Sequence, residues 1–259
     1  MPTTIDLDVQ YKKAEWLALN PSELKELYFY GIKIQDKYGN EMSEETYRSK
    51  ILEAQKEVES MFSLKLAPQI IQEDISFYRD EFESFGFIRT SYPVVVPFNL
   101  DGYLGQVKQI SYPSEWLSSK IHSDGECWNR QIYLVPNQNA ARTGALVYNG
   151  IVPYLGILGY TTLPNYWTVR YGTGYQKLPY DLLGLIGKLA AVKLFIIAGD
   201  LVLNPGIGSQ SLGIDGLSQS ASISAGSAFQ NRIKNYLEEV KTSSSVMRSK
   251  YKGITLGSL

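Results

Sequence analysis

The residues best suited to chemistry in this sequence stand close together in the segment KIHSDGECW. His122 is the only histidine and Cys127 the only cysteine, and Asp124 lies between them. A base, an acid that orients it and a nucleophilic thiol are the parts of a catalytic triad. The fold usually assembles triads from separate elements, whereas these three residues lie within a stretch of six. The spacing therefore predicts a solvent-exposed loop.

A metal centre would lack ligands in the same segment. His122, Glu126 and Cys127 form one short cluster, and the sequence holds no other histidine or cysteine to complete a zinc site. A calcium or magnesium site built from carboxylates alone is compatible with the sequence. A single cysteine also excludes an intrachain disulfide, which fits assembly in a reducing cytoplasm.

Two glycine-rich strings and one acidic cluster complete the candidates for chemistry. Residues 172–177 lack the third glycine of a dinucleotide loop and the GK[ST] of a P-loop, so they predict a strand-to-helix turn. Residues 206–209 predict a loop after a helix. Asp80, Glu81 and Glu83 could pair as in a glycosidase, but with 26 acids in the chain a solvated surface is the simpler interpretation. We therefore predict no enzymatic activity and no cofactor.

Composition constrains the partners of the chain. Its 25 basic and 26 acidic residues give a net charge of −1, so it lacks the basic excess of a protein that grips phosphates tightly. A neutral wall past which DNA slides remains compatible with this balance. The 19 tyrosines and four tryptophans are residues that favour interfaces, although they could equally fill a β-rich core.

Helical patterns occupy the N-terminal part of the chain. Asn20, Pro21 and Glu23 have the pattern of a capping box, which predicts a helix that ends at Gly31. A second, amphipathic helix is predicted over residues 43–63. Its apolar positions recur at spacings of four, three, four and three: Tyr47, Ile51, Ala54, Val58 and Met61.

The C-terminal part predicts two further helices. The first begins after Pro179 and ends near Leu203. The last contains Phe229, Ile233, Leu237 and Val240 and precedes a basic tail. We expect this tail and the Ser/Gly-rich residues 206–228 to order only when a partner is bound.

The predicted helix before Leu203 imitates a membrane span. Lys188 and Lys193 lie near its middle, and each would cost about 2.5–3.5 kcal/mol inside a bilayer. We therefore predict a buried helix and no membrane partner. The N-terminal segment MPTTIDLDVQYKK has no basic region followed by an apolar stretch, so no signal peptide is expected.

Between the helical parts, residues 68–175 predict β-structure. Short aromatic and β-branched segments alternate with Gly, Pro, Asn and Asp over this range. The fold class is therefore α+β, a discontinuous helical-bundle core with a β-rich, barrel- or sandwich-like insertion. The predicted domains are residues 1–67 plus 176–259, and residues 68–175.

Two stretches resemble the head–tail connector, or adaptor, family of tailed bacteriophages. SELKELYFYGI and the following helix carry a motif of the type I-x-x-A-x-x-x-V-E, and residues 167–195 are similar to the family's V-x-Y-x-x-G-Y…P-x-D-L stretch. Residues 209–254 resemble the C-terminal parts of larger neck proteins. The matching positions of the first two motifs are Ile51, Ala54, Val58 and Glu59, then Val169, Tyr171, Gly174, Tyr175, Pro179, Asp181 and Leu182.

The resemblance implies a structural virion protein. It would form a homo-oligomeric ring, commonly of twelve copies, below the portal protein, joining capsid to tail and lining the channel through which DNA leaves during ejection. Expected partners are further copies, the portal, and tail or further neck proteins, with packaged DNA passing the lumen without tight binding. The protein would be located in the virion neck after assembly in the host cytoplasm. Small connectors have near 100 residues, so the β-rich insertion is a departure from them.

The expected contacts of such a ring involve small residues and the basic tail. Small side chains let another helix or subunit approach closely, and tyrosines and basic residues suit a partner surface. The candidate interface positions are Gly184, Gly187, Ala191, Tyr236, Arg248, Lys250, Tyr251 and Lys252. Two alternatives stay open: a tail or baseplate protein with a carbohydrate-binding insertion, and, much less supported, a cell-wall hydrolase.

Overall fold

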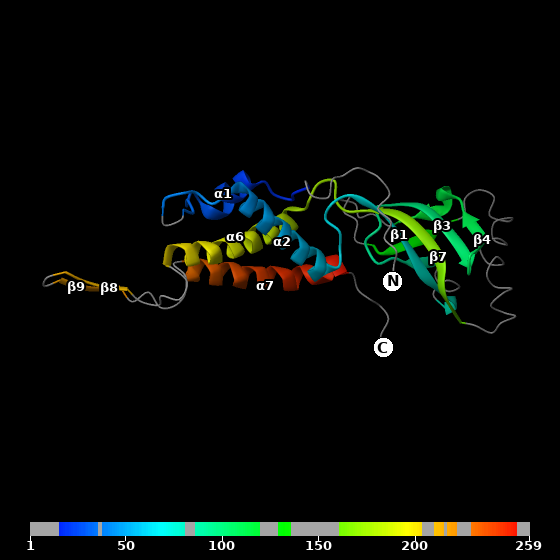
Figure 1. Ribbon diagram of the computed structural model, residues 1–259. Coiled ribbons are helices and arrows are strands. Elements are labelled where there is room, and N and C mark those ends of the chain that lie inside the picture. Colours follow the sequence, from blue (N-terminus) through cyan, green and yellow to red (C-terminus); the bar gives the residue numbers. More distant parts are fainter. Residues whose placement is uncertain are drawn as a thin grey trace. The chain divides into compact units, whose positions relative to one another are not determined.

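The computed structural model describes most of the chain and confirms the α+β fold class (Figure 1). The described residues are 16–35, 38–80, 86–119, 129–135, 161–203, 210–214, 217–221 and 229–252. Of these, residues 200–203, 210–214, 217–221, 249 and 252 are described by their backbone alone. The chain divides into two compact units. The β unit comprises Met1–Trp16, Ser63–Lys177 and Lys250–Leu259, and the helical unit comprises Leu17–Phe62 and Leu178–Ser249. Whether these units match independently folding domains stays a prediction.

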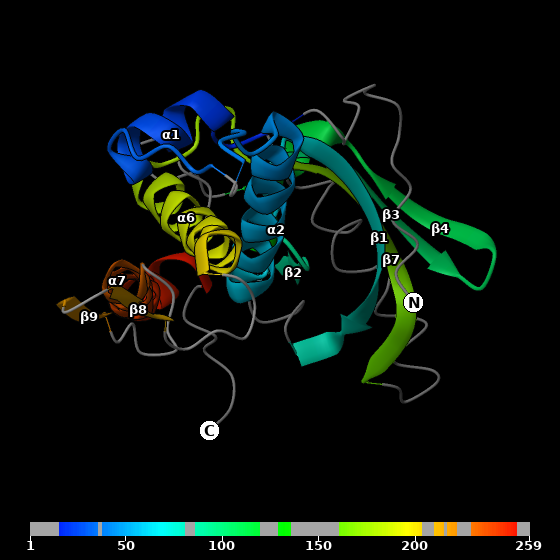
Figure 2. The same cartoon turned by 60° about the vertical axis from the view of Figure 1, so that its left-hand side comes forward.

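Helix α6 forms the centre of the helical unit, with the other helices around it (Figure 2). Its neighbours α1 and α2 come from the N-terminal part of the chain, so the two separated helical stretches pack together as predicted. The strands β8 and β9 form an antiparallel hairpin within the Ser/Gly-rich stretch. The bounds are α1 Pro21–Phe29, α2 Glu44–Phe62, α6 Tyr180–Leu203, α7 Gln230–Lys252, β8 Gln210–Ile214 and β9 Leu217–Ala221.

Local sequence signals explain how α1 and α2 begin and end. Glu23 accepts a hydrogen bond from the Asn20 backbone at 3.0 Å, as a capping box requires. Helix α1 ends slightly earlier than predicted, because Tyr30 already adopts a left-handed conformation with φ 49° before Gly31. Helix α2 buries its predicted apolar face, except that Phe62 rather than Met61 completes it.

The β unit consists of two antiparallel sheets around one core. The four-stranded sheet has the order β1-β7-β3-β4, and the three-stranded sheet has the order β2-β6-β5. Buried side chains from both sheets, including Phe77, Ile132 and Trp167, form a single cluster, which is sandwich-like packing. The strands are β1 Gln69–Tyr78, β2 Phe87–Arg89, β3 Val96–Leu104, β4 Val107–Tyr112, β5 Leu117–Ser118, β6 Gln131–Leu134 and β7 Thr162–Thr173.

The last helix corrects the sequence prediction. Its buried side chains are Tyr236, Val240, Met247 and Tyr251, at spacings of four, seven and four. This apolar face stays in phase with the helical repeat, so α7 continues to Lys252, through the first six of the 13 residues 247–259 that were predicted as a basic tail. Leu237, which belongs to the same predicted helix as Val240, is 46% exposed, whereas Val240 is buried.

Candidate interaction surface

The two lysines of α6 each reach an acid on a different neighbouring helix. Lys188 Nζ lies 2.6 Å from a carboxylate oxygen of Glu239 on α7, and Lys193 Nζ lies 2.6 Å from one of Glu57 on α2. The hydrogen bond with Glu57 raises the pKa of Lys193, so this lysine stays charged. Among the described helices, α6 is the one long and apolar enough to cross a membrane, and 67% of its most apolar window is buried within the chain. These contacts agree with the predicted buried helix.

Small residues on α6 have different neighbours. A Cβ atom added at Gly187 would lie 2.1 Å from the Tyr28 ring, so this glycine lets α1 approach α6 within the same chain. The Tyr28 hydroxyl also lies 3.5 Å from the carbonyl oxygen of Leu183. A Cβ added at Gly184 would meet no atom within 4 Å. Of the two glycines, Gly184 therefore leaves open space on the helix surface.

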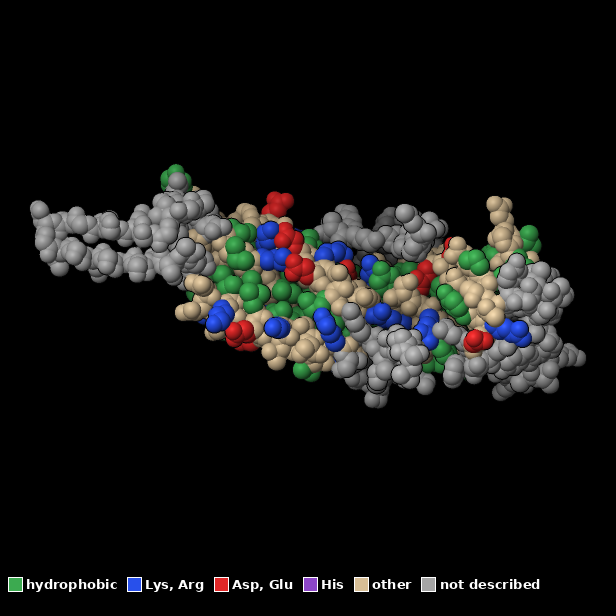
Figure 3. Space-filling model, turned by 90° about the horizontal axis from the view of Figure 1, so that it is seen from below, with side chains coloured by type: hydrophobic (Ala, Val, Ile, Leu, Met, Phe, Trp, Pro, Cys, Tyr) green, Lys and Arg blue, Asp and Glu red, His purple; other side chains and the backbone are tan. Residues whose placement is uncertain are grey.

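Large apolar side chains remain exposed on the helical unit. Leu27 and Tyr30 on α1 and its C-terminal end are 54% and 70% exposed. In Figure 3, hydrophobic side chains gather over the helical unit and are bordered by both basic and acidic side chains. Among the side chains of this unit that the structure describes, the exposed large apolar residues are Leu27, Tyr30, Ile32, Tyr38, Tyr180, Ile196, Leu237 and Val246. Such a surface is typical of a protein that binds a partner.

One flank of α7 carries a shallow groove of about 350 Å³. Its apolar floor comes from Ile233 and Leu237, and the lysines Lys234 and Lys241 flank them. Residues 234, 237 and 241 share a face because they are three and four positions apart. Both lysines are exposed, and neither forms an ion pair with another described residue. The groove therefore presents an apolar strip with free positive charge.

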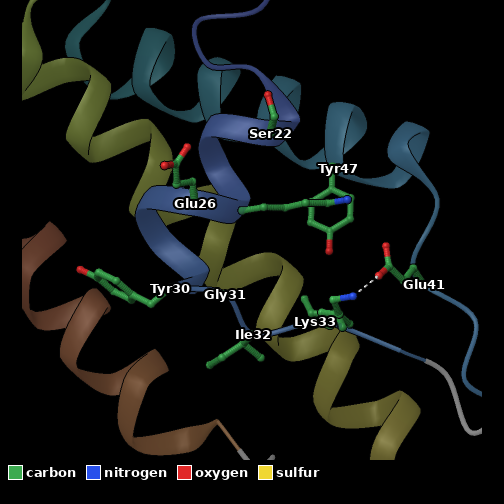
Figure 4. A pocket seen from close by; sticks show the side chains of 10 residues that line it. Ser22, Glu26, Tyr30, Gly31, Ile32, Lys33, Glu41 and Tyr47 are labelled. Carbon is green, nitrogen blue, oxygen red and sulfur yellow. Dashed lines mark ion pairs between the residues drawn. The ribbon is translucent and has the colours of Figure 1, made fainter.

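A larger pocket of about 580 Å³ lies beside the C-terminal end of α1 (Figure 4). Tyr47 points into it from α2, and the Lys25 ammonium lies 4.6 Å from the centre of the Tyr47 ring. Lys33 and Glu41 are joined by an ion pair of 3.5 Å at its edge. Burial raises the pKa of Tyr47, and the nearby Glu41 raises it further, so the phenol stays neutral. The pocket holds no set of groups that could act as base and nucleophile together.

The remaining predicted interface residues lie in varied surroundings. Ala191 is buried in the helical unit, and Tyr236 is buried and donates a hydrogen bond to the Tyr28 carbonyl oxygen at 3.0 Å. Burial raises the pKa of Tyr236. Arg248 is exposed on α7. Lys250 is partly exposed beside buried Tyr251, and Lys252 is described by its backbone alone. Their role in binding a partner stays a prediction.

Sequence reasoning missed the exposed faces of α1 and α7. Glu26, Leu27 and Tyr30 were treated only as members of a helix, and Lys234 and Lys241 were not considered. A signal was present, because Leu24 and Phe29 occupy the buried face of α1 while Leu27 lies outside it. A short helix with apolar residues on two faces indicates a second contact.

The candidates for chemistry receive little support. His122, Asp124, Glu126 and Cys127 lie outside the described residues, as do Glu81, Glu83 and residues 206–209. No group of three or more His, Cys, Asp or Glu able to hold a metal occurs in the described parts of the chain. The turn predicted for residues 172–177 is confirmed, because β7 ends at Thr173 and α6 begins at Tyr180. Gly174 has φ +97°, and an added Cβ would lie 2.3 Å from the Ala67 oxygen, so this glycine serves the turn.

Two buried acids of the β unit are held by donors from neighbouring strands and, for Glu73, from the loop after β2. Glu73, 4% exposed, accepts hydrogen bonds from the Tyr171 hydroxyl and the Ser91 backbone, both at 2.9 Å. Burial, and then the charge of Glu73, raises the pKa of Tyr171, so the phenol remains a donor. Asp101 accepts a hydrogen bond from Ser111 at 2.6 Å and pairs with Lys108 at 2.9 Å. Both acids are therefore part of the packing of the sheet.

Comparison with known proteins gives a likeness of fold at low identity. No family model matches the chain, and no curated protein matches it in sequence. One similar solved structure is a chain in the neck of an empty GTA particle computed with C6 symmetry, with 12% identity, 92% of this chain and 94% of that chain covered, and a TM-score of 0.43. Another comes from the virion of a native gene transfer agent particle, with 11% identity, the same coverages and a TM-score of 0.45. At these values the function has to be argued from the residues themselves.

Proposed function

We propose that this chain is a structural subunit of a head–tail adaptor ring in the neck of a tailed phage-like particle. The observation that carries the proposal is that the helical unit buries a core of its own yet keeps large apolar side chains exposed on α1, α6 and α7. Leu27, Ile196 and Leu237 belong to three different helices, so the apolar surface extends around the unit. A subunit that contacts neighbours on more than one side needs such surfaces.

The charge balance suits a ring that lets DNA pass. With a net charge of −1, a ring of this chain would line the exit channel below the portal without holding the phosphates tightly. The exposed Arg248 near the end of α7 offers a contact for the portal, and the β unit offers one for the tail or further neck proteins. Assembly would take place in the host cytoplasm, with the finished ring in the virion and no membrane or cofactor involved.

A non-enzymatic role agrees with the state of the described polar groups. The buried carboxylates of Glu73 and Asp101 are satisfied by fixed donors and cations, so neither faces an open cleft as an acid or base. The pocket of about 580 Å³ beside α1 is lined by the Lys33–Glu41 ion pair, other charged groups and apolar groups rather than by a nucleophile with its base.

The proposal is tested by locating the chain in particles. We expect it in purified particles, in several copies below the portal in a reconstruction, and we expect its deletion to leave DNA-filled heads without tails. Absence from purified particles, or normal tailed particles after deletion, would refute an adaptor role. Complementation of the deletion strain with the intact gene is the matched control.

Carbohydrate binding by the β unit is the second candidate function. A hollow of about 260 Å³ is lined by Tyr78, Phe87, Arg89 and other residues, and Tyr78 is 50% exposed. An exposed aromatic ring beside a guanidinium is suited to stack on a sugar and donate to its hydroxyls. A glycan array probed with the full chain should show binding that Tyr78→Ala removes. No binding by the wild-type chain would exclude this function.

A further inference from the structure

The outer faces of α1 and α7 in the helical unit have opposite character. On α1, Glu23 and Glu26 lie beside exposed Leu27 and Tyr30. These positions share one face because they recur at spacings of three and four. The Lys25 ammonium on this helix is already engaged, because it lies 4.6 Å from the centre of the Tyr47 ring. The outer face of α1 is therefore apolar and acidic.

The flank of α7 described above, formed by Ile233, Lys234, Leu237 and Lys241, is apolar and basic. Glu238 at its edge leaves a surplus of one positive charge on the groove lining. The exposed Arg248 follows Lys241 by seven positions and extends the same face. The charges of Lys234 and Lys241 have no ion-pair partner among the described residues, and the same is true of Glu26 on α1.

The two faces are of equal length and lie on different sides of α6. Glu23 to Tyr30 and Lys234 to Lys241 each span seven positions, which is about 10 Å along a helix. In Figures 1 and 2, α1 and α7 lie on different sides of α6. Within one chain α1 is held on α6 through Tyr28 and Gly187. Its C-terminal end also meets α7 of the same chain, where the Arg232 guanidinium lies 5.4 Å from the centre of the Tyr30 ring. The exposed side chains of Glu26 and Leu27 are left for another molecule.

We propose that the outer face of α1 in one copy binds the α7 flank of a second copy, with Leu27 against Ile233 and Leu237 and with Glu26 facing the lysines. The contact is heterologous, because it joins two different patches, and repetition of it builds a ring or a chain of subunits. This inference rests on the proposed ring and assigns the surfaces that close it.

Charge reversal tests the contact in the full-length chain. Glu26→Lys should place like charges together and weaken self-assembly at least about tenfold, and Lys234→Glu with Lys241→Glu should do the same from the other side. Sedimentation velocity across a concentration series gives the assembly state. Glu45→Lys on α2 makes the same charge change away from both faces and should assemble as the wild type does.

Mixing the two reversed proteins gives the decisive measurement. Each kind of copy then offers the other an opposite charge at both faces, so an equimolar mixture should regain the assembly that each lacks alone. Circular dichroism of each variant checks that it is folded. If the reversed proteins assemble like Glu45→Lys, or if the mixture stays as weak as its components, the assignment of these faces is wrong.

These experiments distinguish a failure of the α1–α7 contact from a failure of the proposed adaptor function. Wild-type chain that assembles while the reversals have no effect contradicts only the assigned faces. Wild-type chain that stays monomeric at every concentration also contradicts them, while its presence in purified particles would leave the adaptor role standing. Absence from particles would remove the adaptor role even if the α1–α7 contact forms in solution.

Discussion

The β unit and the helical unit solve opposite packing problems. The β unit takes two acids into its interior and gives each a donor there, Tyr171 for Glu73 and Ser111 for Asp101. The helical unit pairs its polar groups at the edges of α6 and keeps apolar groups such as Leu27 and Leu237 outside. The two buried acids of the β unit therefore have their partners within that unit, whereas the exposed apolar side chains of the helical unit leave surface for a partner.

The largest expected effect comes from the core of the β unit. Trp167→Ala should lower the free energy of unfolding by about 3–5 kcal/mol, because Trp167 is 1% exposed and packs against the Phe77 and Tyr166 rings. Chemical denaturation followed by circular dichroism measures it. Val107→Ala, at a 63% exposed position of β4, is the control with little loss. A loss below about 1 kcal/mol for Trp167→Ala would contradict a tightly packed core.

Gly187 and Gly184 sharpen the comparison inside the helical unit. Gly187→Ala should lower the free energy of unfolding by about 1–3 kcal/mol, because the new methyl group would overlap the Tyr28 ring. Gly184→Ala should be neutral or stabilise by about 0.5–1 kcal/mol, because it has open space and alanine favours helix. Thermal melts compare the pair. Equal effects would show that α1 does not depend on Gly187 for its approach to α6.

Removal of the Tyr171 hydroxyl tests whether its hydrogen bond to the buried Glu73 stabilises the β unit. Tyr171→Phe leaves Glu73 without one of its donors and should lower the free energy of unfolding by about 1–3 kcal/mol. Tyr78→Phe, at a half-exposed ring of β1, removes the same group and should change little. If Tyr171→Phe and Tyr78→Phe unfold at the same denaturant concentration, the hydrogen bond from Tyr171 to Glu73 does not stabilise the fold.

The smallest expected effect concerns pH and the paired charges of α2. The hydrogen bond from Lys50 lowers the pKa of Glu53 below its ordinary value of 4.5. The stability that ionised Glu53 contributes to the folded state is therefore present above about pH 4.5 and is lost as the pH falls through the lowered pKa of the folded state. Because Glu53 is exposed, Glu53→Gln should cost only about 0.2–1 kcal/mol at pH 7 and flatten the loss of stability in acid. Thermal melts between about pH 3 and 7, the range over which carboxylates titrate, measure the stability of Glu53→Gln against the wild type. Glu45→Gln is the control.

The sequence by itself determined the helices with clear periodic patterns and the class of the β unit. The stripe from Tyr47 to Val58 repeats at the helical period, and the turn at Gly174 lies where a strand pattern gives way to an apolar helix. These features depend on neighbours a few positions apart, and the amino-acid order encodes such neighbours directly.

Only the tertiary structure decided which apolar residues face inward. Leu237 and Val240 fit the same helical pattern, yet Val240 is buried and Leu237 is not, because the choice depends on where α7 meets the other helices. From the sequence, Gly187 could make room for a neighbouring subunit or for another helix of the same chain. In the structure it makes room for the Tyr28 ring of α1, which is more than 150 positions away in the chain. The physical reason is that a helix has several faces of similar composition, and the burial of each is set by long-range contacts that local spacing does not specify.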